Sequence, residues 1–134
     1  MTATTFNWNV RVYYEDTDIA GVVYHANYLR FFERARTEWL RHLGIGQEKL
    51  MADHGVKFVV RRIAMDFFSA ARLDDLLQIS VSPVKFAGAS VHLEQEARVE
   101  SRRLCAGAVH VACVRDADFL PVPIPEFIKE KMQS

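Results

Sequence analysis

Cysteine is scarce in this chain, with only Cys105 and Cys113 among 134 residues. If one extended strand joins them, their Cα atoms lie roughly 26 Å apart at about 3.3 Å per residue. That separation exceeds the reach of a disulfide, and the spacing matches none of the usual zinc-ligand patterns. We therefore interpret both residues as small core side chains and expect no metal site.

An excess of either charge is also lacking, since 17 Lys and Arg residues balance 17 Asp and Glu residues. The two signs are mixed along the chain, so the electrostatic footprint of a nucleic-acid or anionic-membrane binder is missing. No apolar run approaches the ~20 residues that a membrane helix needs. The N-terminal run M-T-A-T-T-F-N-W-N-V lacks the basic and apolar regions of a signal peptide. The sequence thus predicts a cytoplasmic protein without a transmembrane segment or a nucleic-acid partner.

Linkers and internal repeats are missing as well, which predicts one domain spanning residues 1–134. A chain of this length buries roughly two-thirds of the surface that it exposes when unfolded, enough for one compact core. The G-x-x-x-x-G-K-[ST] motif of nucleoside triphosphate sites and the G-x-S-x-G motif of serine hydrolases are both absent. Neither kind of site is expected.

The most regular pattern lies between His25 and Leu43, where apolar side chains recur at intervals of three and four residues. This spacing predicts an amphipathic helix. Additional apolar residues widen its hydrophobic face, so we expect the helix to be enclosed on more than one side. Gly44 follows it and is suited to a left-handed cap.

Most of the remaining chain predicts strands. They are expected at residues 8–14, 57–68, 77–82, 91–99 and 104–114, with short helices near 46–53 and from Glu126. The run 104–114 is apolar at both parities, which indicates a central strand covered by the helix, with His110 as a hydrogen-bonded core group. Short connections at Gly88 and Ser101 favour antiparallel hairpins.

The order of these elements is strand, long helix, then four strands. It predicts an α+β fold in which a curved five-stranded antiparallel sheet wraps around one long central helix. Such a sheet leaves a strand edge and its outer face uncovered. We therefore expect a homo-oligomer, either a dimer or a homotetramer.

Reactive side chains concentrate between Tyr13 and Tyr28, where the first strand gives way to the helix. Asp-rich turns are often merely solvated, and composition alone leaves that interpretation open. This turn, however, leads through Gly21 to the helix N-terminus, whose unpaired N–H groups and positive dipole end can polarise a carbonyl oxygen. Asp18 and His25 add a carboxylate and an imidazole, groups that acyl transfer to water uses.

One run, residues 13–38, resembles the signature of a known family: Y-Y-E-D-T-D-I-A-G-V-V-Y-H-A-N-Y-L-R-F-F-E-R-A-R-T-E. The family is the 4-hydroxybenzoyl-CoA thioesterases, in the subgroup of Tol-Pal-associated acyl-CoA thioesterases. Further matches follow in register at residues 58–61, 70–75 and 112–114. The resemblance covers nearly the whole chain and implies the hotdog fold, whose element order is the one inferred above. It also implies hydrolysis of acyl-CoA to a free acid and CoA, with no cofactor because CoA is part of the substrate.

The resemblance further implies roles for individual residues. Asp18, the second Asp of the D-x-D pair, falls on the family's catalytic aspartate and acts as general base or nucleophile. His25 is the histidine typical of the subgroup, and the N–H that binds the thioester oxygen falls near Tyr24 and His25. The predicted substrate-binding residues are Gly21, Tyr24, Phe58, Val59 and Val60. Structural or packing roles are expected for Glu15, Asp16, Asn27 and Tyr28.

CoA carries phosphate groups, so a cationic rim is expected beside the thioester site. The candidate CoA-binding residues are Arg61, Arg62, Lys85 and Ser90. Related enzymes often have an Arg/Lys-rich turn at residues 86–90, where this chain has F-A-G-A-S. This departure leaves ordinary solvated surface charge open as the alternative for each candidate.

Two other functions remain open. Hydratases and dehydratases of this fold often place Asp five residues before His, whereas Asp18 and His25 are seven apart. A binding module with slight turnover would instead dock acyl carrier protein or enzymes of lipid synthesis, using a basic patch such as Arg30, Arg34 and Arg41. Acyl carrier protein is therefore a candidate partner beside acyl-CoA.

Overall fold

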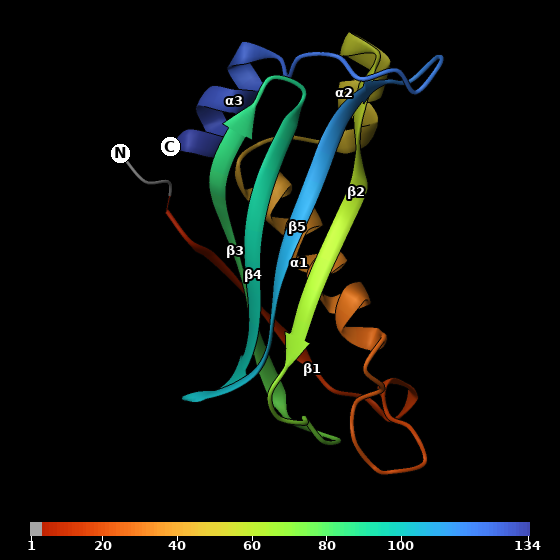
Figure 1. The fold of residues 1–134 in the computed structure, drawn as a ribbon, viewed down its shortest axis with the longest axis vertical. Helices are drawn as coiled ribbons and strands as arrows, with labels where there is room; N and C mark the ends of the chain where they lie inside the picture. The colour runs from red at the N-terminus through yellow and green to blue at the C-terminus, as the bar shows by residue number, and fades with distance from the viewer. Residues whose placement is uncertain (1–3) are drawn as a thin grey trace.

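The structure is a computed structural model that describes residues 4–134. Its elements in chain order are β1 (Phe6–Arg11), a short 3-10 helix η1 (Tyr14–Asp16), α1 (Asn27–His42), α2 (Gln47–His54), β2 (Val56–Phe67), β3 (Leu76–Ala87), β4 (Ser90–Val99), β5 (Arg102–Arg115) and α3 (Glu126–Gln133). The strands form one antiparallel sheet in the order β1-β3-β4-β5-β2. Figure 1 shows α1 against one face of this twisted sheet. The predicted α+β architecture is confirmed.

Helix α1 forms where the three-and-four periodicity predicted it. Phe31, Phe32 and Ala35 are fully buried, while Trp39 is 3% exposed. The helix ends before Gly44, whose φ of +80° is the left-handed conformation expected of a cap residue. The apolar face of α1 therefore supplies one half of the core.

The sheet supplies the other half through strict alternation. On β4, for example, Val91, Leu93 and Ala97 face α1 and are at most 2% exposed. On β5, Gly107 lies so close to the helix that an added Cβ would sit 2.9 Å from a ring carbon of Phe32. This approach lets the aromatic face of α1 rest directly on the sheet.

Three expectations require correction. The first strand covers Phe6–Arg11 instead of residues 8–14, because the chain turns into η1 at Tyr14. Strand β5 is an interior strand but not the middle one, which is β4. His110 is half-buried, and it shares the outer parity of β5 with Ala108 instead of the core parity of Val109. The mixture of small and apolar residues in β5 had concealed this alternation.

Within residues 4–134, strand β2 forms one edge of the sheet and is paired only with β5. Its register with β5 shifts between Val60 and Arg62, so Arg61 is an extra residue in the strand. Among residues 4–134, no helix is both long enough and apolar enough to cross a membrane.

Candidate active site

The site segment is a compact loop between β1 and α1 that is tied by its own backbone. Thr17 and Val23 form an antiparallel bridge, the Asp18 N–H donates to the Val22 carbonyl at 2.9 Å, and the Gly21 N–H donates to the Asp18 carbonyl at 2.9 Å. Gly21 has φ +80°, a conformation that a side chain would disfavour. These contacts hold the exposed Asp18 side chain at the tip of a tight turn.

The buried side chain of Asp16 stabilises the conformation of this loop. Its carboxylate is 6% exposed and accepts one hydrogen bond at 2.8 Å from the Tyr13 N–H and another at 2.8 Å from the Asn27 side-chain amide. The first bond closes η1, and the second joins the loop to the first residue of α1. The predicted structural role of Asp16 is confirmed. Glu15, by contrast, is exposed.

Tyr28 packs beneath the start of α1. It is 2% exposed, and its hydroxyl accepts a hydrogen bond at 3.3 Å from the Ala71 N–H. Burial raises the pKa of the Tyr28 phenol, so this residue stays neutral. Together with Asn27 it fixes the helix start, as expected of packing residues.

Several backbone N–H groups near the N-terminus of α1 already donate hydrogen bonds within the protein, which limits the donors that can bind a substrate carbonyl. The N–H of Asn27 donates to Tyr24, and that of Leu29 to Ala26, in 3-10-type bonds of 2.8 and 3.2 Å. The Tyr24 N–H donates a hydrogen bond to the Asp16 carbonyl at 2.9 Å. Within residues 4–134, no protein group accepts from the N–H of His25 or of Ala26. Of the two positions indicated by the sequence, His25 thus retains an available donor and Tyr24 does not.

The His25 side chain is exposed and lies between two aromatic rings. Its ring centroid is 4.7 Å from that of Tyr24 and 6.1 Å from that of Phe67, the latter in an edge-on arrangement. Phe67 is the last residue of β2. The helix start and the end of the edge strand are therefore neighbours.

The predicted substrate-binding residues do not all lie together in one chain. Asp18 and Gly21 line an open hollow together with Tyr14, Thr17, Ile19 and Leu73. Phe58, Val59 and Val60 instead line a separate pocket of about 170 Å³ between α1 and the sheet. Figure 1 shows why: β2 begins beside α2, whereas the orange-red site loop lies at the opposite end of the molecule.

Three of the four predicted CoA-binding residues do meet, in a third pocket. Arg61, Arg62 and Ser90 line it together with two residues that sequence reasoning did not select, His92 and His110. The fourth, Lys85, pairs with His92 across β3 and β4. The outward parity of His92 was readable from β4, but that of His110 was not.

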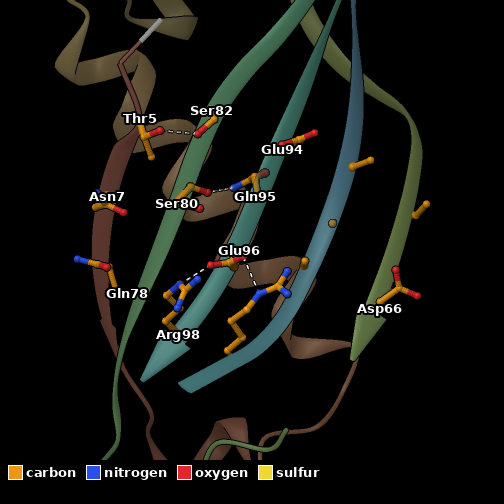
Figure 2. Close-up of a pocket in the computed structure, with 15 residues that line it drawn as sticks. Thr5, Asn7, Asp66, Gln78, Ser80, Ser82, Glu94, Gln95, Glu96 and Arg98 are labelled. Carbon is orange, nitrogen blue, oxygen red and sulfur yellow. Dashed lines mark hydrogen bonds and ion pairs between the residues drawn. The ribbon is translucent and has the colours of Figure 1, made fainter. Parts of the chain in front are cut away.

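Another hollow, of about 600 Å³, lies on the outer face of the sheet and includes none of the predicted site residues. Figure 2 shows its polar floor, where Glu96 pairs with Arg98 and Arg103. Asp66 and Glu94 also line the hollow, so three carboxylates face two guanidinium groups and charge of neither sign is concentrated there. Among residues 4–134, no group of three or more His, Cys, Asp or Glu side chains is arranged to hold a metal ion.

Comparison with known proteins decides the family. The sequence profile of the "Thioesterase-like superfamily" matches residues 12–132, from the end of β1 to α3. The chain belongs to this superfamily. The matched residues include both the Asp18 loop and the edge strand β2.

Individual members of the thioesterase-like superfamily are similar over most of their length. The acyl-CoA thioesterase YbgC of Haemophilus influenzae is 46% identical over 124 residues, covering 92% of this chain and 91% of the relative. The acyl-CoA thioester hydrolase YbgC of Escherichia coli O6:H1 is 45% identical over 129 residues, covering 96% of each chain. A crystal structure of a probable thioesterase from Bartonella henselae superposes with a TM-score of 0.87 at 34% identity, covering 91% of this chain and 100% of that one.

Proposed function

We propose that this chain is an acyl-CoA thioesterase that hydrolyses the thioester to a free acid and CoA. The observation that carries the proposal is the Asp18 loop, which leads directly into a helix N-terminus with an available N–H at His25. The YbgC relatives, named as acyl-CoA thioesterases or thioester hydrolases, support it through 45–46% identity over nearly the whole chain.

The chemistry needs one carboxylate and one polarised carbonyl. The thioester oxygen accepts a hydrogen bond from the His25 N–H, with the positive end of the α1 dipole behind it, which stabilises the oxyanion. Asp18 then takes a proton from water while the water oxygen bonds to the acyl carbon. The C–S bond breaks, and the CoA thiolate receives that proton. In the alternative route, Asp18 attacks directly to give a mixed anhydride that water opens; we favour water activation.

The separation of the predicted residues within one chain supports a composite site in a homodimer. The edge strand β2 has an unpaired side, and edge strands readily pair with a second copy. Antiparallel pairing about a two-fold axis would bring the Val56 end of one β2 against the Phe67 end of its partner. Because Phe67 lies beside His25, the partner's segment 58–62 would then adjoin the Asp18 loop.

The composite site predicts which acyl groups fit. Phe58 and Val60 share their inner parity with Val111 and Cys113 and line the pocket of about 170 Å³ beside α1. A cavity of about 150 Å³ accommodates one benzene ring. We therefore propose that short or single-ring acyl groups are preferred over long chains.

A free-thiol release assay across short, long and aromatic acyl-CoAs tests the activity and this preference together. Replacing Asp18 by Ala should lower kcat by about 10²- to 10⁴-fold, the usual contribution of a general base. Glu15→Ala is the matched control, because it removes an exposed carboxylate of the same loop. Undiminished hydrolysis by the Asp18→Ala protein would refute the assignment, and a flat, slow substrate profile would favour a binding module.

Complementation between inactive variants tests the composite site. Asp18→Ala and a β2 variant such as Val60→Arg would each be inactive as homodimers. If each site takes residues from both chains, random remixing should restore about a quarter of wild-type activity, because half the dimers then contain one intact site. If mass spectrometry shows that mixed dimers have formed but no activity returns, the composite site is excluded. Sedimentation analysis distinguishes this dimer from the predicted homotetramer.

A second substrate class is favoured by the exposed surface of α1. Arg30 and Arg34 are both exposed, four residues apart on the helix. Such a pair suits an acidic carrier, so acyl carrier protein thioesters are proposed as alternative substrates. Comparing the hydrolysis of carrier-bound and CoA-bound acyl groups by the wild type and by Arg30→Gln/Arg34→Gln tests this proposal. The double substitution should slow hydrolysis of the carrier-bound substrate only. The Tol-Pal-associated subgroup and the cytoplasmic location remain predictions from the sequence.

A further inference from the structure

Two histidines form a stacked pair on the outer face of the sheet. His92 of β4 lies directly opposite His110 of β5, with ring centroids 3.7 Å apart and ring planes only 6° from parallel. Both side chains are half-buried. The hydrolysis of a thioester at Asp18 makes no use of this pair.

A bulge brings two consecutive arginines to the same pocket as the histidines. Successive residues of a regular strand point to opposite faces of the sheet. In β2 the register shift between Val60 and Arg62 inserts Arg61 as an extra residue, and a bulge re-aims side chains in this way. Arg61 and Arg62 consequently both line the outer pocket of about 360 Å³, with Ser90, whose hydroxyl donates to the Ala87 carbonyl at 3.2 Å, at its β4 side.

The charges around the pair are mostly positive. Strand β2 contributes Arg61 and Arg62, and β3 contributes Lys85 opposite His92. On β4 the next residue of outward parity is Glu94, the carboxylate nearest in sequence to the pair on either histidine strand. Within residues 4–134, neither arginine has a carboxylate oxygen within 4.0 Å of its guanidinium nitrogens. The pocket thus combines unneutralised cations with two titratable rings.

We infer that this pocket binds phosphate groups through Arg61 and Arg62, and that the stacked His92–His110 pair makes the binding stronger as the pH falls. Guanidinium groups suit phosphate because their N–H fork matches its oxygens. The inference deepens the proposed function and rests on it, since CoA supplies the phosphates.

The pH dependence follows from the geometry of the pair. Two charged rings with centroids 3.7 Å apart would repel one another, so His110 disfavours the protonated form of His92. Partial burial, His110 and Lys85 all lower the pKa of His92 from its ordinary value. A phosphate beside the rings has the opposite effect and favours an imidazolium. Binding below neutral pH is therefore accompanied by proton uptake, whereas at higher pH it depends on the arginines alone.

Calorimetric titration with two probes tests the inference. Inorganic sulfate keeps a constant charge, whereas CoA has a phosphate that itself titrates near pH 6, so sulfate isolates the contribution of the protein. Between about pH 7.5 and about pH 5.5, sulfate affinity of the wild type should rise about tenfold, because an imidazolium adds a positive charge beside the bound anion. The double variant His92→Gln/His110→Gln should change by less than about twofold. His54→Gln, an exposed histidine on α2, is the matched control and should behave as wild type.

Other results would overturn the inference. It fails if wild-type affinity is independent of pH, if the double variant keeps the wild-type slope, or if Arg61→Gln/Arg62→Gln binds sulfate undiminished. A second measurement does not depend on variants: the NMR titration midpoint of the His92 ring must rise when CoA is added, and an unchanged midpoint refutes the coupling. Absent thioester hydrolysis with pH-dependent sulfate binding would refute the proposed function alone; intact hydrolysis with pH-independent binding would refute this inference alone.

Discussion

Replacing Asp16 should mainly lower stability, whereas replacing Asp18 should mainly lower catalysis, although the two carboxylates are only two residues apart. Asp16→Ala removes the acceptor of two hydrogen bonds of 2.8 Å, from the Tyr13 N–H and the Asn27 amide. Asn27 is 8% exposed, so its amide would lose its partner largely out of reach of water. Asp18→Ala removes one bond of 2.9 Å, from the Ala20 N–H, at an exposed site.

The expected magnitudes follow from these contacts. A hydrogen bond to a charged group contributes about 1.5–3 kcal/mol, and a buried unsatisfied donor costs about 1–3 kcal/mol. Tyr13 is exposed and its N–H can turn to water, so the Asn27 amide dominates the loss. We expect Asp16→Ala to lower the free energy of unfolding by about 3 kcal/mol and Asp18→Ala by less than about 1 kcal/mol. Asp16→Asn should fall between them, since one amide oxygen can serve only one of the two donors well.

Urea denaturation followed by circular dichroism measures the first effect, and free-thiol release from an acyl-CoA measures the second. Asp16→Ala is expected to lower the denaturation midpoint, whereas Asp18→Ala keeps the midpoint and loses turnover. The reasoning is refuted if Asp16→Ala is as stable as wild type, because its buried contacts would then contribute nothing. It is equally refuted if the two variants lose turnover only in proportion to their loss of folded protein.

Two further predictions concern the core. Gly107→Ala should destabilise the protein by about 1–2 kcal/mol in urea denaturation, since overpacking against the fully buried Phe32 outweighs the gain in backbone entropy. Adding Phe32→Leu to the same chain should reduce this cost. If the effects of the two substitutions on stability are additive, the predicted contact between them is contradicted. Burial raises the pKa of the Cys105 thiol to about 12 and also raises that of Cys113, so neither should react with a thiol reagent at about pH 8 until the protein unfolds. Fast labelling of the native protein would contradict that burial, and slow labelling keeps the thiol-release assay free of background.

Local patterns in the sequence were sufficient for most of the fold. The spacing of apolar residues located α1 to within two residues at its start, and Gly44 marked its end. Alternation located the inner face of β4 because each residue there is clearly apolar or polar. The first strand was misplaced because Tyr13 and Tyr14 favour strands by composition, whereas the side chain of Asp16 bends the backbone there into η1. That hydrogen bond depends on where a carboxylate points, which strand propensity does not contain.

The sequence by itself determined the element order, the superfamily motif and the position of Asp18 before a helix start, because each depends on residues close together in the chain. Only the tertiary structure decided which residues meet. The bulge at Arg61 places two consecutive arginines in one pocket, and cross-strand register stacks His92 on His110, residues 18 positions apart. Register also separates Phe58 from Asp18 within one chain. These relations arise from pairing between distant strands, which no local pattern encodes.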